Sequence, residues 1–150
     1  MKKYLFTQDC GIFLNQILIA VNCQYKDILD YAKKYGNKEF IDGIIQYKKT
    51  INSLLTKKGF VILNKTLNYG GLLYLENFEN KWRYLKTLLH EIHHLVFMVA
   101  RQKNFEDEME AQAYLFDYLF SDIRRKLFDK IEKDKKIAKG KRLTNKKKGE

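Results

Sequence analysis

The sequence predicts a single α+β domain that is mostly helical and carries a small β-hairpin or sheet. Apolar residues recur at helical spacing over most of the chain, and two short apolar runs that follow glycines are typical of strands. The 150 residues, of which 45% are hydrophobic, suffice to bury a core, and no proline interrupts any element. We expect the domain to span residues 1–136.

The first segments of the chain are short and apolar. Tyr4–Thr7 and part of Gly11–Val21 are predicted to be extended, although Gly11–Val21 also suits a buried helix. Polar residues interrupt this second segment, which is too short to span a bilayer, and the N-terminus lacks the pattern of an export signal. We therefore expect a soluble, cytoplasmic protein that does not bind membranes.

Two helices with recognisable ends are predicted next. Tyr25–Tyr35 is amphipathic and is followed by Gly36, a residue type that commonly ends helices. Asn37 is suited to cap a second helix. That helix should continue to about Lys57, because its apolar residues recur at helical spacing.

A β-hairpin and a long helix should follow. Gly59–Asn64 and Gly70–Leu75 are predicted to be two strands joined by a turn near Asn68–Gly70. The long helix should begin after Asn77 or Asn80, either of which can cap it. Its apolar face is predicted to consist of Trp82, Leu85, Leu88, Leu89, Ile92, Val96 and Val99.

This long helix contains all three histidines of the chain, in the motif His90-Glu91-Ile92-His93-His94. Residues four apart lie on one side of a helix, so His90 and His94 should present their rings side by side to one divalent cation. Glu91 lies about 100° from His90 around the axis, where its carboxylate is suited to act as a general base. His93 in place of His94 is an alternative, and a helix whose histidines bind nothing is another.

A catalytic zinc ion needs a third protein ligand besides two histidines. Cys10 and Cys23 lie far upstream and are expected to be reduced, buried, apolar residues. The remaining candidates after the motif are the acids of Glu106-Asp107-Glu108-Met109-Glu110.

A second helix should begin at these acids, with Asn104 or Asp107 as its cap. In its helical pattern Glu110 falls among the inward positions, where a carboxylate is costly unless it pairs with a cation or a metal. We therefore favour Glu110 as the third ligand. Glu106, one turn earlier on nearly the same face, is the alternative, and the acids otherwise complement the helix dipole.

Together the two motifs resemble a known family. His90-Glu91-Ile92-His93-His94 and the later Glu110-Ala111-Gln112-Ala113-Tyr114-Leu115-Phe116-Asp117-Tyr118 are similar to the H-E-x-x-H…E-x-x-A-Y-L-x-x-Y arrangement of small zincin-like proteins of bacteriophages, and more broadly to the gluzincin metallopeptidases. The resemblance covers roughly residues 59–128. It implies a zincin-like domain in which a small sheet packs on the motif helix. It also implies a zinc ion held by His90, His94 and Glu110, with Glu91 as the general base.

The function that the resemblance implies is hydrolysis of an amide bond in a peptide or protein by a zinc-dependent metallopeptidase. Tyr114, with Tyr118 nearby, compares with the phenols that stabilise the oxyanion in related enzymes. Leu72–Leu75 is our candidate for the edge strand along which a substrate backbone would bind. A phage protein of this kind would act in the host cytoplasm or be associated with the virion.

Two alternatives belong to other functional classes. In the first, a non-catalytic virion-associated or host-interacting protein keeps the metal as a structural element, with His90, His94 and Glu110 joined by a fourth ligand such as Glu106. In the second, the basic C-terminus contacts nucleic acid or another polyanion weakly. Residues 121–150 hold thirteen Lys or Arg against five acids, within a formal net charge of +11, and residues 137–150 are predicted to form a flexible basic tail.

Overall fold

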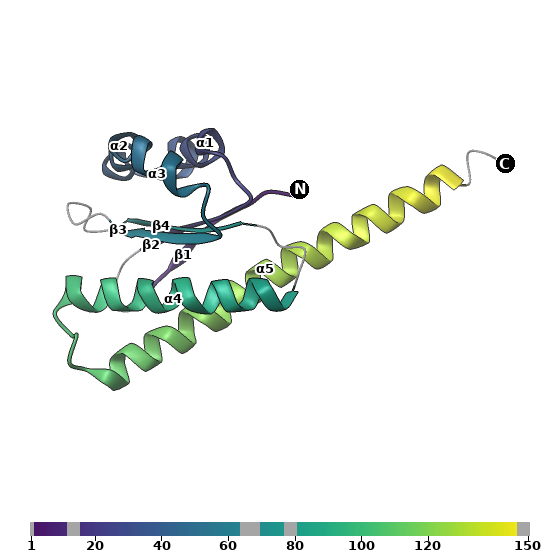
Figure 1. Cartoon of the computed structure of the whole chain (residues 1–150). Helices are drawn as coiled ribbons and strands as arrows, with labels where there is room; N and C mark the ends of the chain where they lie inside the picture. Colours follow the sequence, from purple (N-terminus) through teal and green to yellow (C-terminus); the bar gives the residue numbers. More distant parts are fainter. Residues whose placement is uncertain (1, 12–15, 64–69, 77–80, 147–150) are drawn as a thin grey trace. The chain divides into compact units, whose positions relative to one another are not determined.

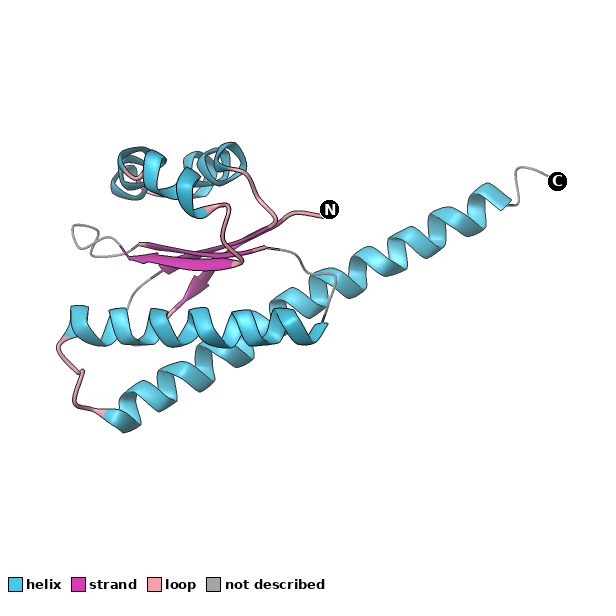
Figure 2. Ribbon diagram, in the orientation of Figure 1, coloured by secondary structure: helices cyan, strands magenta, loops and turns pink. Residues whose placement is uncertain are grey.

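The fold is α+β, as the sequence predicted, with helices flanking a four-stranded sheet (Figures 1 and 2). The computed structural model describes residues 2–11, 16–63, 70–76 and 81–146. In chain order the elements are β1 (Tyr4–Asp9), β2 (Gln16–Val21), α1 (Tyr25–Tyr35), α2 (Lys38–Gln46), α3 (Lys48–Leu54), β3 (Gly59–Leu63), β4 (Gly71–Leu75), α4 (Lys81–Lys103) and α5 (Met109–Lys146).

The chain forms two compact units, residues 1–120 and residues 121–150, and the boundary lies within α5. The segment predicted as a flexible tail, residues 137–150, is helical as far as Lys146. In the described residues no helix is long and apolar enough to cross a membrane.

The sheet has the strand order β1-β2-β4-β3. β1 is antiparallel to β2, β3 is antiparallel to β4, and β2 is parallel to β4. The predicted hairpin is therefore present, with Phe60 opposite Tyr74 and their rings stacked 5.0 Å apart. The parallel pair joins the two halves of the sheet, because Ile19 of β2 lies opposite Leu73 of β4.

Successive side chains of a strand point to opposite faces of the sheet, and in this sheet both faces are apolar. One face packs against α1, α2 and α3 in a cluster that includes Leu18, Ala20, Ile28, Ala32, Ile44, Ile51, Phe60, Leu72 and Tyr74. The opposite face carries Ile17, Ile19, Leu73 and Leu75, all essentially inaccessible to solvent. α4 covers this opposite face and packs against β3 and β4 (Figure 1).

α4 turns an apolar stripe toward the sheet. Leu88, Ile92, Leu95 and Val99 have no exposed surface and recur at helical spacing. Leu89, which was predicted to belong to the apolar face, is instead 38% exposed. The stripe fixes the rotation of α4 about its axis and hence the direction of every other side chain on it.

The ends of α1 and α2 follow the sequence prediction. Gly36 ends α1, and an added Cβ there would lie 2.7 Å from the Ala32 carbonyl oxygen, so a larger residue has no room. Asn37 caps α2, because its side-chain oxygen accepts a hydrogen bond from the Phe40 amide at 2.8 Å.

The single helix predicted from Asn37 to about Lys57 is two helices, α2 and α3, separated at Tyr47. Tyr47 has φ −85° and ψ 12°, outside the helical region. The Tyr25 hydroxyl donates a hydrogen bond to the Ile44 carbonyl at 3.2 Å. This tertiary contact occupies a carbonyl at the end of α2, and it favours the break.

The turn between α4 and α5 differs from the prediction. Asn104 has a left-handed φ of 58°, and the amide of the next residue, Phe105, donates to the Ala100 carbonyl. This is a Schellman motif, so Asn104 ends α4 rather than capping α5. Neither Asn104 nor Asp107 starts α5, which begins at Met109. The candidate caps Asn77 and Asn80 and the turn residues Asn68 and Tyr69 lie outside the described residues.

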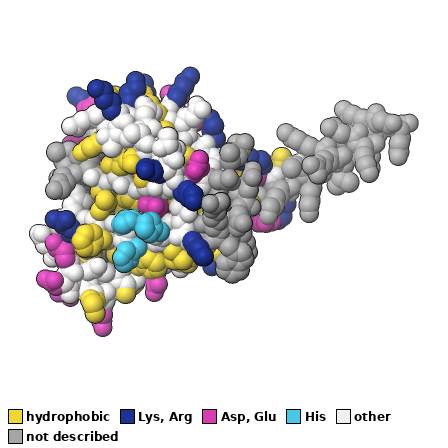
Figure 3. All heavy atoms as spheres, in the orientation of Figure 1, with side chains coloured by type: hydrophobic (Ala, Val, Ile, Leu, Met, Phe, Trp, Pro, Cys, Tyr) yellow, Lys and Arg dark blue, Asp and Glu magenta, His cyan; other side chains and the backbone are white. Residues whose placement is uncertain are grey.

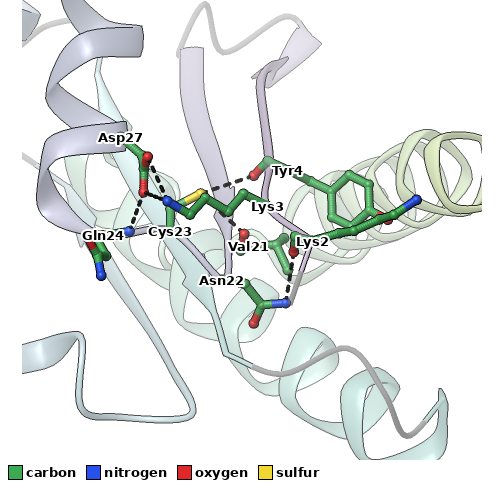
Figure 4. A network of polar contacts seen from close by, with 8 residues as sticks. All are labelled: Lys2, Lys3, Tyr4, Val21, Asn22, Cys23, Gln24 and Asp27. Atoms are coloured by element: carbon green, nitrogen blue, oxygen red, sulfur yellow. Dashed lines mark hydrogen bonds and ion pairs between the residues drawn. The ribbon is translucent and has the colours of Figure 1, made fainter. Parts of the chain in front are cut away.

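Both cysteines are free and buried, as the sequence suggested. Desolvation raises the pKa of Cys10 to about 12 and that of Cys23 to about 11. The Cys23 thiol lies close to the carbonyl oxygens of Val21 and Tyr4 (Figure 4). At neutral pH the two side chains are therefore neutral thiols that serve the packing of the core.

An ion pair links the N-terminus to α1 (Figure 4). The Asp27 carboxylate accepts from the Lys3 ammonium at 2.8 Å and from the Gln24 backbone amide at 2.8 Å. The hydrogen bond from Lys3 is the main reason that the pKa of Asp27 lies below its ordinary value. The Asp27 side chain thus accepts from a backbone amide at the start of α1 and also ties the segment before β1 to this helix.

We predict that Asp27→Ala lowers the free energy of unfolding by about 1 kcal/mol, the usual cost of a lost helix cap. Because the pKa of Asp27 is lowered in the folded state, its contribution is present at neutral pH and is lost as the pH falls below the ordinary carboxyl value of about 4. Urea unfolding at neutral and acidic pH measures both effects. Asp30→Ala, at an exposed position of the same helix, is the control, and an equal loss in both variants would contradict the prediction.

Candidate functional site

The histidines of the motif form an exposed patch on α4 (Figure 3). The Nε2 atoms of His90 and His94 lie 3.1 Å apart, with the two rings edge to face. The expectation that these two residues lie side by side is confirmed. His93 is also exposed but does not form this pair.

Glu91 lies between the histidine pair and the apolar stripe of α4 and is 5% exposed. Its carboxylate lies against the start of β3, where a Cβ added to Gly59 would come within 2.8 Å of Oε1. Burial raises the pKa of Glu91, and the nearby His90 opposes that rise. The side chain is thus a desolvated carboxylate held next to an imidazole.

An open groove of about 580 Å³ gives access to Glu91 and His90. Its walls come from α4 on one side and from the segment that leads into β3 on the other. The lining residues are Thr56, Lys57, Lys58, Gly59, Lys86, Thr87, His90 and Glu91.

The lysines of this groove were missed by the sequence analysis. Lys86 lies four residues before His90 and so shares its side of α4, a relation that the sequence does contain. Lys57 and Lys58 reach the same place only because β3 packs against α4. No spacing rule relates residues of α4 to those preceding β3.

Glu110 is exposed on the first turn of α5, so the burial argument that favoured it is wrong. The buried residues of this part of α5 are Leu115 and Leu119. Glu110 lies about 140° from Leu115 and about 180° from Leu119 around the helix axis, on the side away from the core. Glu106 is exposed as well.

Neither acid joins the histidine pair. Among the residues that the structure describes, no group of three or more His, Cys, Asp or Glu side chains is placed to hold a metal ion. His90 and His94 are therefore brought together, whereas Glu110 and Glu106 are not grouped with them.

The two tyrosines of the second motif differ in their surroundings. Tyr114 is 63% exposed and lies on the same side of α5 as Glu110. Tyr118 is partly buried, and its ring would be 3.7 Å from a Cβ added to Gly11. Tyr118 thus packs near the end of β1, and neither phenol lines the groove beside Glu91.

The candidate edge strand also needs correction. Leu72–Leu75 belongs to β4, which lies between β2 and β3 and is buried along its whole length. In the described part of the sheet the edges are β1 and β3. β3 is the edge next to the groove, because its first residue, Gly59, contacts Glu91.

No family model, curated protein or solved structure matches this chain. The likeness to zincin-like proteins therefore depends on the two motifs alone.

We predict that Gly59→Ala destabilises the protein by about 1–3 kcal/mol, the usual cost of inserting a methyl group where no space is left for it. The new methyl group would clash with Glu91 and with the Thr87 methyl, both within 3 Å. In a Glu91→Ala background part of the clash is gone, so Gly59→Ala should cost less there. A double-mutant cycle by urea unfolding measures this coupling, and equal costs in the two backgrounds would contradict it.

Proposed function

We propose that this protein is a zinc-dependent metallopeptidase that hydrolyses an amide bond in a peptide or protein. The observation that carries the proposal is the pair of Nε2 atoms 3.1 Å apart on an exposed helix face, beside a buried carboxylate. Zinc binds imidazole nitrogen at about 2.0–2.1 Å in a tetrahedral arrangement, which separates two ligand nitrogens by about 3.3 Å. His90 and His94 therefore fit one zinc ion with little movement.

Zinc bound by this pair would supply a Lewis acid that makes a water molecule nucleophilic at neutral pH. Glu91 is the residue suited to handle the proton. It lines the same groove as His90, and burial raises its pKa, which favours a carboxylate that first accepts and then returns a proton. The groove is open to solvent, and the missing side chain of Gly59 leaves room for the carboxylate.

The third protein ligand remains the one that the motif resemblance implies, Glu110. Its position on an exposed turn means that binding zinc requires it to move toward the histidines. Tyr114 lies on the same side of α5, so a movement that brings Glu110 closer would carry this phenol with it. Its proposed role is to stabilise the oxyanion.

The open groove favours this proposal over a non-catalytic protein with a structural metal. Structural zinc sites have four protein ligands, whereas a catalytic site leaves one position open. His90 lines the groove, the neighbouring His94 is exposed, and Glu106, the suggested fourth ligand, is not grouped with them.

We expect about one zinc ion per chain in protein purified without an affinity tag, measured by mass spectrometry. His90→Ala and His94→Ala should each remove it, because either change leaves one imidazole. His93→Ala is the matched control and should keep the zinc. Wild-type protein without zinc, or a loss in the His93 variant equal to that in the others, would contradict the proposal.

Glu91→Gln should keep the zinc and lower hydrolysis of a labelled unfolded protein such as casein by at least about 100-fold, the usual scale for a general base. The amide has nearly the same shape as the carboxyl group but accepts no proton at neutral pH. Cleavage is measured as the release of labelled fragments. Undiminished cleavage by this variant would exclude Glu91 as the base.

Glu110→Gln and Glu106→Gln distinguish the two candidate third ligands. We predict that Glu110→Gln weakens zinc binding by about 10- to 100-fold and that Glu106→Gln leaves it unchanged. Competition with a chelator measures the affinity. The reverse order would identify Glu106 as the ligand, and no effect of either change would show that the third protein ligand is another residue.

A further inference from the structure

The groove beside Glu91 is lined by three lysines from two separate elements. Lys57 and Lys58 precede β3, and Lys86 belongs to α4, one turn before His90. All three side chains are exposed, and none forms an ion pair with a described carboxylate. Figure 3 shows basic side chains on the same face as the histidine patch.

The lining contains one carboxylate against these three ammonium groups. That carboxylate is Glu91, which is buried at the base of the groove. The mouth is therefore positively charged, and a groove with charge of one sign concentrates ligands of the opposite sign. Lys3, by contrast, is paired with Asp27.

We propose that this groove binds an extended peptide with acidic side chains and presents its backbone to Glu91 and His90. The inference rests on the proposed function and adds a substrate class to it. Carboxylates on either side of the bound peptide bond would pair with Lys57 and Lys58 on one wall and with Lys86 on the other.

Three observations favour a peptide over a nucleic acid. The described lining contains no Phe, Tyr or Trp ring on which a base could stack. The volume of about 580 Å³ holds only a few residues, whereas nucleic acids are bound along longer basic tracks. The groove also begins at Gly59 of the edge strand β3, and a free strand edge offers backbone hydrogen bonds to an extended peptide.

Equilibrium binding of two rhodamine-labelled peptides to zinc-loaded Glu91→Gln protein tests the inference without cleavage. One peptide alternates glutamate and alanine, and the other replaces each glutamate with glutamine. We expect the glutamate peptide to bind about tenfold more tightly at low salt and to lose most of this advantage at physiological salt.

Two triple variants in the same background assign the charge effect to the groove. The groove variant combines Lys57→Gln, Lys58→Gln and Lys86→Gln. It should lose the preference for the glutamate peptide. The control, which combines Lys33→Gln, Lys38→Gln and Lys49→Gln, removes the same charge from exposed positions on α1, α2 and α3, the opposite side of the sheet. It should keep the preference, and circular dichroism verifies that both variants are folded.

Equal binding of the two peptides, or an equal loss in the two triple variants, would overturn the inference. So would tighter binding of single-stranded DNA that is lost in the groove variant alone. Failure of the proposed function is seen separately, in the zinc content and in casein cleavage by the wild type. If a zinc-free protein still prefers the glutamate peptide through these lysines, the basic groove stands as a binding site for acidic peptides and the peptidase proposal fails.

Discussion

The packing of α4 on the sheet is the constraint on which the candidate site depends. The stripe formed by Leu88, Ile92, Leu95 and Val99 loses its contact with water only if it faces the strands, and burial of four such side chains is worth several kcal/mol. This fixes the rotation of the helix. His90 and His94 then point away from the sheet to solvent, while Glu91, on the flank of the stripe, is drawn into the interface.

Burial of Glu91 is unfavourable in itself, because a carboxylate loses hydration there, and this loss raises the pKa of the side chain. An apolar residue of similar size would suit the same position better for stability alone. Gly59 has no side chain, and for this reason the carboxylate of Glu91 fits against the start of β3. A buried ionisable side chain beside a groove is a feature that functional sites share, and this agrees with the proposed role of Glu91.

Local sequence signals located most elements but not their arrangement. Gly36 and Asn37 marked helix ends correctly, because a crowded turn and a side-chain cap are local properties. The parallel pairing of β2 with β4 joins distant strands, and the break at Tyr47 accompanies a hydrogen bond from distant Tyr25. The histidine pair was predictable from spacing. The lysine groove was not, because it forms between α4 and the start of β3.

The position of Glu110 follows from the length of α4. The helix continues nine residues beyond His94 to Lys103, about 13 Å at 1.5 Å per residue, before the chain reverses. Hydrogen bonds hold the turn between α4 and α5. The Phe105 amide donates to the Ala100 carbonyl, and the Gln112 side-chain amide donates to the Glu106 carbonyl. Extended, residues 104–110 span up to about 23 Å, enough to reach the histidines once these bonds open. In the proposed site, zinc binding through Glu110 would therefore require a rearrangement of this turn, whereas zinc binding by the histidine pair alone would not.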